Sequence, residues 1–305
     1  MSAPKVSVFM PVYNTGKYIE KSIQSILNQT FSDFEFIIIN DGSTDDSLDI
    51  IKKYSEIDSR IKFISRENKG IIFTRNEGLN ISKGKYIALM DSDDVSYPSR
   101  LRLQYDFLEE HNEYVVVGSR IMLIDPDDDF ICPMVDIFEH DDIDFGHINN
   151  VTSGAIVVNP TAMICRDSLI QVGGYHERYK NAEDIDVWLR LAEVGKLYNL
   201  NEILLNYRQH FDSIGYSYRG SQLKSIEYAI TDACNRRGVN NPNIEDASPS
   251  KYIKRTNNDV YIKWGWWALS GDNIATTRKY AKKAILSNPF KFQAWKLLLC
   301  SIRGY

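Results

Sequence analysis

The stretch YIALMDSDD, residues 86–94, joins an apolar segment to three carboxylates within four positions. Its first five residues predict a buried strand, and Asp91, Asp93 and Asp94 follow directly. Neighbouring carboxylates repel one another, so their place after a core strand calls for a positive partner. A divalent cation such as Mg²⁺ or Mn²⁺ is one candidate, because these ions bind carboxylate oxygens and share them with phosphates. A solvated turn that caps the next helix explains the same residues.

Strands and helices alternate around this stretch. The predicted strands are residues 5–12, 34–41, 60–66, 85–91 and 114–119. Apolar residues at helical spacing predict helices over residues 16–30, 42–54 and 70–82, and another that opens at Pro98. In the second helix, Ser43 and Asp46 have the spacing of a capping box. Strands this apolar, separated by helices, predict an α/β fold with a mostly parallel sheet covered on both faces.

Polar residues follow three of these strands. Asn14 comes after the first, Asp41 closes the second, and Asp91 with Asp93 follows the fourth. Parallel sheets bind ligands at the carboxyl ends of their strands. The sequence therefore predicts one site that gathers acids from separate strand ends.

The second half of the chain is less regular. Residues 123–152 are acidic and aperiodic, which predicts loops or short excursions over the active edge. Residues 182–196 predict a helix, and residues 196–210 predict a pair of strands that ends the catalytic body. From about residue 217 the pattern is helical, and residues 273–289 resemble half of a tetratricopeptide-type hairpin.

Composition narrows the possible partners. The net charge of -5 argues against non-specific nucleic-acid binding. The four cysteines form no CxxC pair or Cys/His cluster, so neither a zinc site nor a disulfide framework is predicted, and a reducing compartment fits. The N-terminus lacks the apolar segment of a signal peptide, and no segment reaches the ~20 apolar residues that span a bilayer. We therefore expect a cytoplasmic protein, with any membrane contact peripheral and on the inner face.

Five segments, in order, resemble the family 2 glycosyltransferases. They are VSVFMPVYN (6–14), IIINDGSTDDS (37–47), NKGIIFTRNEG (68–78), YIALMDSDD (86–94) and NAEDIDVWLRL (181–191). Their order and spacing over roughly the first 210 residues are more specific than any one motif. The resemblance implies a GT-A-type nucleotide-binding sandwich over residues 1–216. Residues 1–120 would be its nucleotide-binding half and residues 121–216 its acceptor-side half, and residues 217–305 would form a helical C-terminal region.

The resemblance also implies an activity. Such enzymes are metal-dependent, with Mn²⁺ or Mg²⁺, and invert configuration at the anomeric carbon. They move a hexosyl or N-acetylhexosaminyl group from a nucleotide-sugar, here expected to be a UDP-sugar, to a hydroxyl of a glycan or lipid-linked glycan. The expected setting is the synthesis of a bacterial surface polysaccharide such as O-antigen or capsule.

On the donor side, the resemblance assigns Asp41 to the base, commonly uracil, and Arg75 to the base or the diphosphate. DSDD matches the family's DxD motif, in which Asp91 would hold ribose or metal and Asp93 would bind the metal. The full set implied at the nucleotide-sugar is Pro11, Tyr13, Asn14, Asp41, Arg75, Asp91, Ser92 and Arg208. The implied metal ligands are Asp91, Asp93 and His210, although a lone histidine at a strand end also fits a plain surface position.

On the acceptor side, the resemblance makes Asp184 the general base, with Glu183 beside it. Asp184 starts a predicted helix, whose dipole would favour its ionised form. A first helical turn that simply favours acids explains the same pair.

The C-terminal region leaves two interpretations open. It carries four of the five tryptophans (Trp264, Trp266, Trp267 and Trp295), and no acidic residue follows Asp272. A cationic, aromatic segment suits peripheral contact with an anionic membrane. A small helical subdomain with inward tryptophans and solvated lysines suits the same residues.

Two rival functions also remain at this point. A sugar nucleotidyltransferase should carry a glycine-rich phosphate loop after the first strand, where this chain has PVYNTGKY. A non-catalytic nucleotide-sugar-binding protein would have no need for intact DSDD and AEDID motifs, but their presence does not exclude it.

Overall fold

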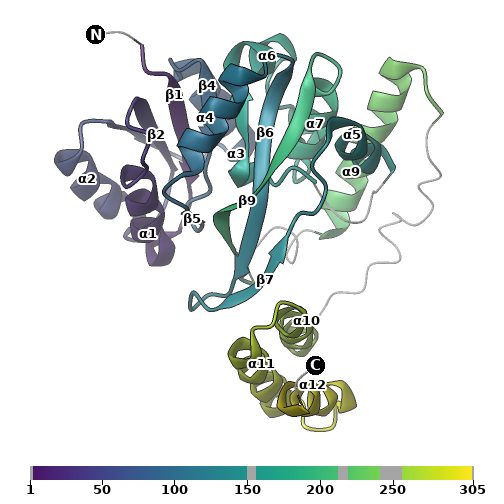
Figure 1. Ribbon diagram of the computed structural model, residues 1–305. Coiled ribbons are helices and arrows are strands. Elements are labelled where there is room, and N and C mark those ends of the chain that lie inside the picture. Colours follow the sequence, from purple (N-terminus) through teal and green to yellow (C-terminus); the bar gives the residue numbers. More distant parts are fainter. Residues whose placement is uncertain (1–2, 150–155, 212–218, 241–255, 304–305) are drawn as a thin grey trace.

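The computed structural model describes residues 3–149, 156–211, 219–240 and 256–303. In these residues nine strands form one sheet in the order β3-β2-β1-β4-β8-β6-β9-β5, with β7 paired to β6 (Figure 1). The strands are β1 (Val6–Val12), β2 (Phe34–Asp41), β3 (Ile61–Arg66), β4 (Tyr86–Leu89), β5 (Val95–Ser96), β6 (Tyr114–Ile124), β7 (Phe130–Met134), β8 (Met163–Cys165) and β9 (Lys196–Arg208). The first four strands are mutually parallel, β8 runs antiparallel to β4 and β6, and β9 is parallel to β6.

Helices cover both faces of this sheet. The α-helices are α1 (Gly16–Leu27), α2 (Ser47–Ile57), α3 (Ile71–Ile81), α4 (Arg100–Glu110), α5 (His140–Asn149), α6 (Arg166–Gln171), α7 (Glu183–Leu191), α9 (Arg219–Arg237), α10 (Asn257–Ser270), α11 (Ile274–Ser287) and α12 (Phe292–Arg303). Along β1, Val8 and Met10 pack with α1, α2 and α4, whereas Phe9 packs with α3, α6 and α7 on the opposite face. This period of two places apolar side chains in both layers, which is why the strands read as continuous apolar runs.

Two predictions for the second half are wrong. Residues 196–210 contain one long strand, β9, and not a strand pair, because β9 pairs with β6 along most of its length despite irregular register at Ser119 and Arg120. The acidic middle region, predicted as loops or short excursions, holds regular elements in its described residues 123–149: β6 runs on to Ile124, β7 follows, and α5 comes after it. Its acids lie in the β6–β7 turn, in the segment before α5 and on α5, whose buried residues are Ile143 and His147, so no clear apolar period marks these elements in the sequence.

The predicted capping box is also wrong. Helix α2 begins at Ser47, and its N-cap residue, Asp46, makes no side-chain capping hydrogen bond. Ser43 instead accepts a hydrogen bond from the backbone N–H of Asn14 at 3.0 Å. Asp45 Oδ1 accepts from the backbone N–H of Ser47 at 3.1 Å. These side chains therefore bind the loop that follows β1 and the start of α2.

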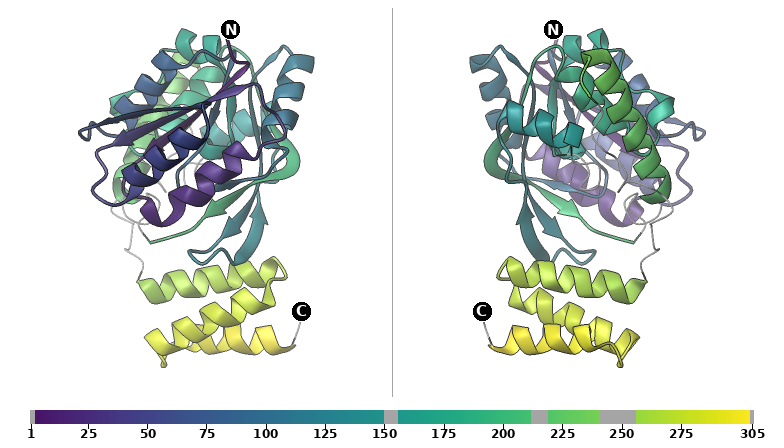
Figure 2. Two further views of the ribbon diagram at one scale, coloured as in Figure 1. Left: turned by 90° about the vertical axis from the view of Figure 1, so that its left-hand side faces the viewer. Right: turned by 90° about the vertical axis from the view of Figure 1, so that its right-hand side faces the viewer.

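The C-terminal helices pack in two places. Helix α9 lies on α7, where Ile226 and Ile230 contact Ile185 and Leu189. Helices α10, α11 and α12 stack together below the β6–β7 hairpin (Figures 1 and 2). The predicted boundary at residue 216 lies outside the described residues. None of the described helices is long and apolar enough to cross a membrane.

The contact between α10–α11 and β7 is close. Trp264 and Tyr280 join the same core as Ile131 of β7. A Cβ added to Gly271 would lie 2.7 Å from the carbonyl oxygen of Ile131, so only glycine fits there. Trp264 is thus an inward tryptophan, as one of the two interpretations of this region expects, whereas Trp295 is 45% exposed.

Candidate active site

The acidic loop after β4 is bound to the end of β9. The backbone N–H of Arg208 donates to Asp94 Oδ1 at 2.8 Å, and its Nε donates to the carbonyl of Asp93 at 2.7 Å. Nε2 of His210 lies 2.7 Å from Asp93 Oδ2. Residues more than a hundred positions apart therefore meet at this loop, and the structure brings together DSDD, Arg208 and His210 as predicted for one site.

Helices α3 and α7 meet at a buried ion pair. Arg75, on α3, pairs through Nη1 with Oε1 of Glu183, the first residue of α7, and both side chains are almost fully buried. The guanidinium also lies 5.4 Å from the ring centroid of Tyr175. Arg75 is therefore held against Glu183, and its contact with base or diphosphate stays a prediction.

The two acidic motifs act on one another electrostatically. Burial raises the pKa of Asp91 to about 7; Arg75 opposes this rise, whereas the charges of Asp93, Asp184 and Glu183 add to it. Asp91 from the end of β4 and Asp184 from the start of α7 thus share one site. The predicted convergence of acids from distant parts of the chain is present in the structure.

Asp184 does not behave as its helix position suggests. Burial raises its pKa from 3.8 to about 6, and the neighbouring charge of Glu183 adds to this, while Arg75 and the backbone N–H of Ile185 lower it. Ile185 donates to Asp184 Oδ1 at 2.8 Å. The expectation that the helix dipole favours the ionised form is wrong in its net direction, because burial outweighs it. A carboxyl with a pKa near 6 is mostly ionised at neutral pH and is still a fair proton acceptor.

The side chains near Asp93 fit a divalent cation. Asp93 and His210 offer an oxygen and an imidazole nitrogen, and Asp91 lies close enough to feel the charge of Asp93. Among the described residues no cluster of three or more His, Cys, Asp or Glu side chains could hold a metal by itself. Mg²⁺ sites commonly use one or two carboxylates and take the remaining oxygens from phosphates and water. The donor set therefore fits a cation that arrives with a phosphate ligand, not a site built from protein alone.

Asp94 is the buried member of the loop. Its side chain is 1% exposed, and its Oδ2 has no hydrogen-bond partner among the described residues. Burial raises its pKa well above the ordinary value, and Asp93 and Asp91 add to the shift. Ser22 of α1 donates to its backbone carbonyl at 2.6 Å. Asp94 therefore stabilises the loop from inside, while Asp91 and Asp93 remain partly exposed.

Arg208 is bound within the protein. Besides its bonds to the acidic loop, its Nη1 lies 2.6 Å from Asp128 Oδ1 and 3.1 Å from the carbonyl oxygen of Asp125. Its guanidinium lies 4.5 Å from the ring centroid of Tyr18, and the residue is 2% exposed. Arg208 thus connects the DSDD loop to the β6–β7 turn. Its predicted contact with phosphate is not tested by these bonds.

Asp41 holds the loop that leads into α3. Its carboxylate pairs with Arg66 and accepts from the backbone N–H groups of Lys69 and Gly70 at 2.8 and 3.0 Å. Its backbone carbonyl accepts from Asn68 Nδ2 at 2.9 Å. A role in binding a base stays a prediction, and any such contact would share a carboxylate that already has protein partners.

The remaining predicted donor residues lie at the ends of β1 and β4. Tyr13 is 53% exposed, so its ring is accessible for stacking. Asn14 has a positive φ of 54° and accepts from the backbone N–H of Thr44 at 2.8 Å, which joins the loops after β1 and β2. Pro11 lies within β1 opposite Ile39. Ser92 is buried and accepts from Thr15 Oγ1 at 3.0 Å, so it faces the protein interior.

Two tyrosines near the site had no predicted role. Burial raises the pKa of Tyr175 above its usual range, and Glu183 and Asp184 add to this; its hydroxyl has no partner among the described residues. Burial together with Asp94 and Asp91 raises the pKa of Tyr207. Tyr207 could have been suspected from the sequence, because it lies beside Arg208. Nothing near Tyr175 in the sequence marks it, because the charged residues that act on it belong to other segments.

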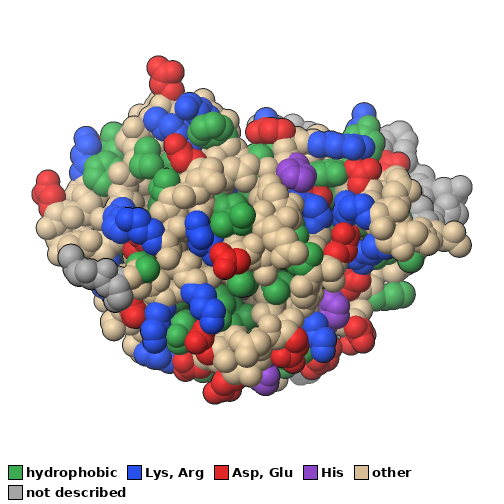
Figure 3. All heavy atoms as spheres, turned by 90° about the horizontal axis from the view of Figure 1, so that it is seen from above, with side chains coloured by type: hydrophobic (Ala, Val, Ile, Leu, Met, Phe, Trp, Pro, Cys, Tyr) green, Lys and Arg blue, Asp and Glu red, His purple; other side chains and the backbone are tan. Residues whose placement is uncertain are grey.

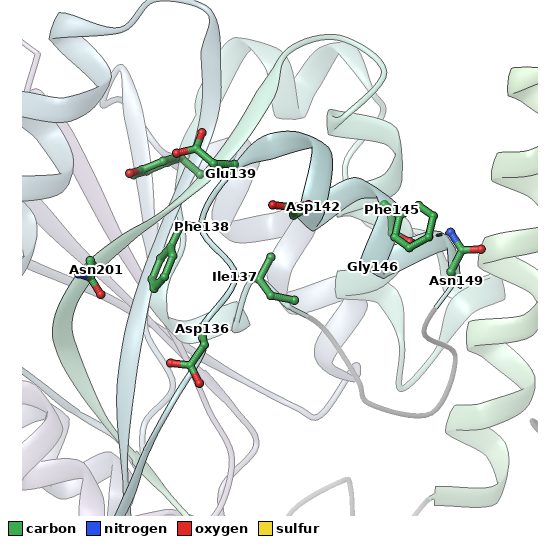
Figure 4. Close-up of a pocket in the computed structure, with 10 residues that line it drawn as sticks. Asp136, Ile137, Phe138, Glu139, Asp142, Phe145, Gly146, Asn149 and Asn201 are labelled. Carbon is green, nitrogen blue, oxygen red and sulfur yellow. Dashed lines mark hydrogen bonds between the residues drawn. The ribbon is translucent and has the colours of Figure 1, made fainter.

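A separate groove lies between α5 and the segment that follows β7. It has a volume of about 690 Å³, and its lining includes the rings of Phe138, Phe145 and Tyr198. Figure 4 shows Phe138 on the segment before α5 and Phe145 on α5, with Asp142 and Asn149 nearby. Phe145 is 69% exposed, and no lysine or arginine is among the lining residues of the described chain. None of the predicted donor or metal residues lines this groove.

Comparisons with known proteins agree with this geometry. Residues 7–171, more than half of the chain, match the sequence profile of Glycosyl transferase family 2. The chain is 35% identical over 246 residues to the O-antigen biosynthesis glycosyltransferase WbnJ of Escherichia coli. The aligned segment covers 77% of this chain and 91% of WbnJ. It is 31% identical over 243 residues to the hyaluronan synthase of Pasteurella multocida. The aligned segment covers 80% of this chain but 24% of that protein. The chain thus spans about a quarter of the length of that relative.

A solved structure gives the fold. S. aureus TarS 1-349 in complex with UDP-GlcNAc matches with a TM-score of 0.64 at 18% identity, over 98% of this chain and 89% of that one. This likeness, together with the sheet and its two helical layers, confirms the predicted GT-A-type α/β fold with C-terminal helices. The profile match and the similarity to WbnJ show that this chain belongs to glycosyl transferase family 2.

Proposed function

We propose that this protein transfers a sugar, with inversion, from a UDP-sugar to a hydroxyl group of a glycan acceptor. The observation that carries the proposal is that the DSDD loop, where His210 Nε2 lies 2.7 Å from Asp93 Oδ2, lies close enough to the start of α7 for the charge of Asp184 to act on Asp91. The first motif suits a diphosphate and its cation, and the second suits a proton acceptor. Two such motifs in one site match a reaction in which a diphosphate leaves while a hydroxyl is deprotonated.

On the donor side, Asp93 and His210 would hold Mn²⁺ or Mg²⁺, with Asp91 beside them on ribose or metal. The cation, when bound, would offset the charge that grows on the leaving diphosphate. Asp41 would accept hydrogen bonds from the uracil base, and Tyr13 would stack near it. Arg208 would act chiefly through its bonds to Asp93 and Asp94, which keep the loop in place before the donor arrives.

On the acceptor side, Asp184 is the general base. The acceptor oxygen attacks the anomeric carbon, the bond to the diphosphate oxygen breaks, and the hydroxyl proton passes to the Asp184 carboxylate. General-base catalysis of this kind typically contributes ~10²–10⁴-fold. Glu183 would not take the proton, because its carboxylate is buried against Arg75; it would hold α7 so that Asp184 faces the site.

The groove at α5 is the proposed seat of the acceptor glycan. Its aromatic rings offer flat faces for sugars, and its carboxylates and amides pair well with hydroxyl groups. Because its described lining residues include no lysine or arginine, it suits a sugar chain better than a phosphate. Replacing Phe145 with Ser should raise the KM for acceptor and leave donor hydrolysis unchanged. Equal loss of both activities would contradict this assignment.

The proposed setting is bacterial surface-polysaccharide synthesis, such as O-antigen or capsule, at the cytoplasmic side of the cell membrane. The similarity to WbnJ, an O-antigen biosynthesis glycosyltransferase by its name, supports this choice. The acceptor would be a lipid-linked glycan, which the enzyme would meet through peripheral contact by its basic C-terminal region.

Release of UDP from a panel of UDP-sugars, with Mn²⁺ and without acceptor, tests the proposed activity. Slow hydrolysis of one donor that EDTA abolishes is the expected result. Tight binding of a UDP-sugar without any turnover would favour the non-catalytic binding protein instead. Formation of a UDP-sugar from UTP and a sugar phosphate would favour the nucleotidyltransferase.

A further inference from the structure

Helix α12 is apolar on two opposite faces. On its inner face, Ala294 and Leu297 are fully buried against α10 and α11. On its outer face, four large apolar side chains are between 45% and 76% exposed: Phe292, Trp295, Leu299 and Ile302. Their spacing of three, four and three residues places them on one stripe. A helix with apolar residues on two opposite faces is typical of one that is covered on both sides.

Two more exposed apolar side chains precede the helix. Phe290, in the turn before α12, is 96% exposed, and Leu286, near the end of α11, is 84% exposed. Figures 1 and 2 show α12 as the outermost helix of the C-terminal stack, with its outer side turned away from the sheet. The stripe therefore lies at an extremity of the molecule, where it is sterically open to a large flat surface.

The exposed charges on α12 itself are basic, and Lys291, just before the helix, pairs with Asp259 of α10. Lys296 and Arg303 are exposed on the outer face of α12, next to Trp295 and Ile302, and no acidic residue occurs after Asp272. The opposite end of the molecule is different: Figure 3 shows acidic and basic side chains intermingled there. An interface on α12 must therefore supply negative charge as well as an apolar layer.

We propose that the outer face of α12 (Phe292–Arg303), with Leu286 and Phe290 before it, docks on an anionic lipid bilayer. Tryptophan, phenylalanine and leucine would enter the boundary between headgroups and acyl chains, while Lys296 and Arg303 would extend to lipid phosphates. A second copy of this chain fits less well, because a two-fold contact through the same stripe would place these cations close to their equals. A bilayer supplies both the apolar layer and the negative charge.

This inference rests on the proposed function for its purpose, since it would hold the enzyme beside a lipid-linked acceptor. The predicted binding to vesicles depends only on the surface of α12. Vesicle binding can therefore be measured on the full chain without donor, metal or acceptor.

The test is cosedimentation with vesicles of phosphatidylglycerol and phosphatidylethanolamine, compared with vesicles of phosphatidylcholine alone. The wild-type protein should bind the anionic vesicles, and added salt should weaken the binding. The triple variant Phe292→Ser/Trp295→Ser/Leu299→Ser should lose it. The variant Lys296→Gln/Arg303→Gln should bind about 30-fold more weakly, since each basic residue near an anionic surface contributes about fivefold.

The matched control is Ile57→Ser, at the end of α2. Ile57 is 69% exposed, as open as the α12 residues, and lies outside the stripe. This variant should bind vesicles like the wild type, and all variants should keep their circular-dichroism spectra because the replaced side chains are exposed.

Three outcomes would overturn the proposal. The first is that the wild type does not bind vesicles, the second is that the triple variant binds them equally well, and the third is that the wild type forms a dimer that the triple variant does not form. The last result would assign the stripe to a second copy. Donor hydrolysis is measured on the same preparations. Hydrolysis without vesicle binding would remove only the docking proposal, and vesicle binding without hydrolysis would remove only the proposed activity.

Discussion

Nζ of Lys279, on α11, lies 2.5 Å from Oδ2 of Asp125, a fully buried carboxylate in the β6–β7 turn. The hydroxyl of Tyr280 donates to the same oxygen at 2.8 Å. The backbone carbonyl of Asp125 accepts from Arg208, which in turn binds Asp94 through its backbone N–H. The C-terminal helices are thus connected to the DSDD loop through a continuous path of hydrogen bonds.

This path predicts that Lys279→Met weakens binding of Mn²⁺ and UDP by roughly tenfold, or about 1.4 kcal/mol. The substitution removes the cation shared by Asp125, Asp127 and Asp129, which loosens the turn that holds Arg208. We also expect a loss of about 1–3 kcal/mol in the free energy of unfolding. Titration calorimetry with Mn²⁺ and UDP measures the first effect and urea unfolding the second.

The control for this prediction is Lys282→Met, an exposed lysine on the same helix. It should change neither quantity by more than about 0.5 kcal/mol. If Lys279→Met lowered stability but left ligand binding intact, the path would be structural only.

Asp184→Asn should abolish transfer and spare donor binding. Asparagine keeps the shape and the acceptor oxygen for the N–H of Ile185 but cannot take a proton. We expect kcat to fall by ~10²–10⁴-fold, with the KM for donor within a few-fold of wild type. Steady-state kinetics with a UDP-sugar provide the measurement. A rate close to wild type would exclude Asp184 as the base.

The pH dependence follows from the raised pKa of Asp184, about 6. The ionised form is the base, so activity should be full above pH 7 and fall about tenfold per unit below pH 6. A rise in pH has the opposite effect on the contribution of Asp184 to stability. The folded state favours the neutral carboxyl, so the contribution of Asp184 to stability is complete below its unfolded value near 4 and is lost as the pH rises to about 6.

Melting temperatures of wild type and Asp184→Asn across this range isolate that contribution. The difference between the two proteins should grow between pH 4 and pH 6 and stay constant above, with the variant the more stable at the higher pH. A flat difference would mean that Asp184 has an ordinary pKa.

Arg75 and Glu183 should behave as a coupled pair. Arg75→Met leaves Glu183 as a buried charge whose Oε2 already lacks a partner among the described residues. Breaking such a pair typically costs about 3–5 kcal/mol. The double variant Arg75→Met/Glu183→Leu should recover part of this loss, because neither charge then remains. Chemical denaturation of all four proteins gives the coupling energy, and additive losses would show that the two residues do not interact.

The first half of the fold is readable from the sequence because β1, β2 and β4 are almost entirely buried and mostly apolar, and α1 and α2 each carry one apolar stripe. The second half is not, since β8 has three residues and β9 carries Asn199 and Asn206 among its apolar positions. Their pairing is set by neighbours distant in the sequence. No local periodicity in the sequence predicts which strands β8 and β9 pair with.

For the same reason, the sequence predicts one part of the candidate site and not the other. Asp91, Asp93 and Asp184 could be proposed as site residues because strand ends and a helix start are visible in the sequence. The contacts that hold the site together, such as Arg75 with Glu183 and Arg208 with Asp94, join residues 108 and 114 positions apart. Burial, which reverses the expected shift of Asp184, is likewise a property of the folded chain.

The central claim is that acids from β4 and α7 face one cation-bound diphosphate. Anomalous scattering from a crystal soaked with Mn²⁺ and UDP tests it most directly. The account predicts a manganese peak at Asp93 and His210, next to the diphosphate, with the nucleotide on the same side of the sheet as Asp184. Manganese at another site, or a nucleotide bound on a face remote from Asp184, would contradict it.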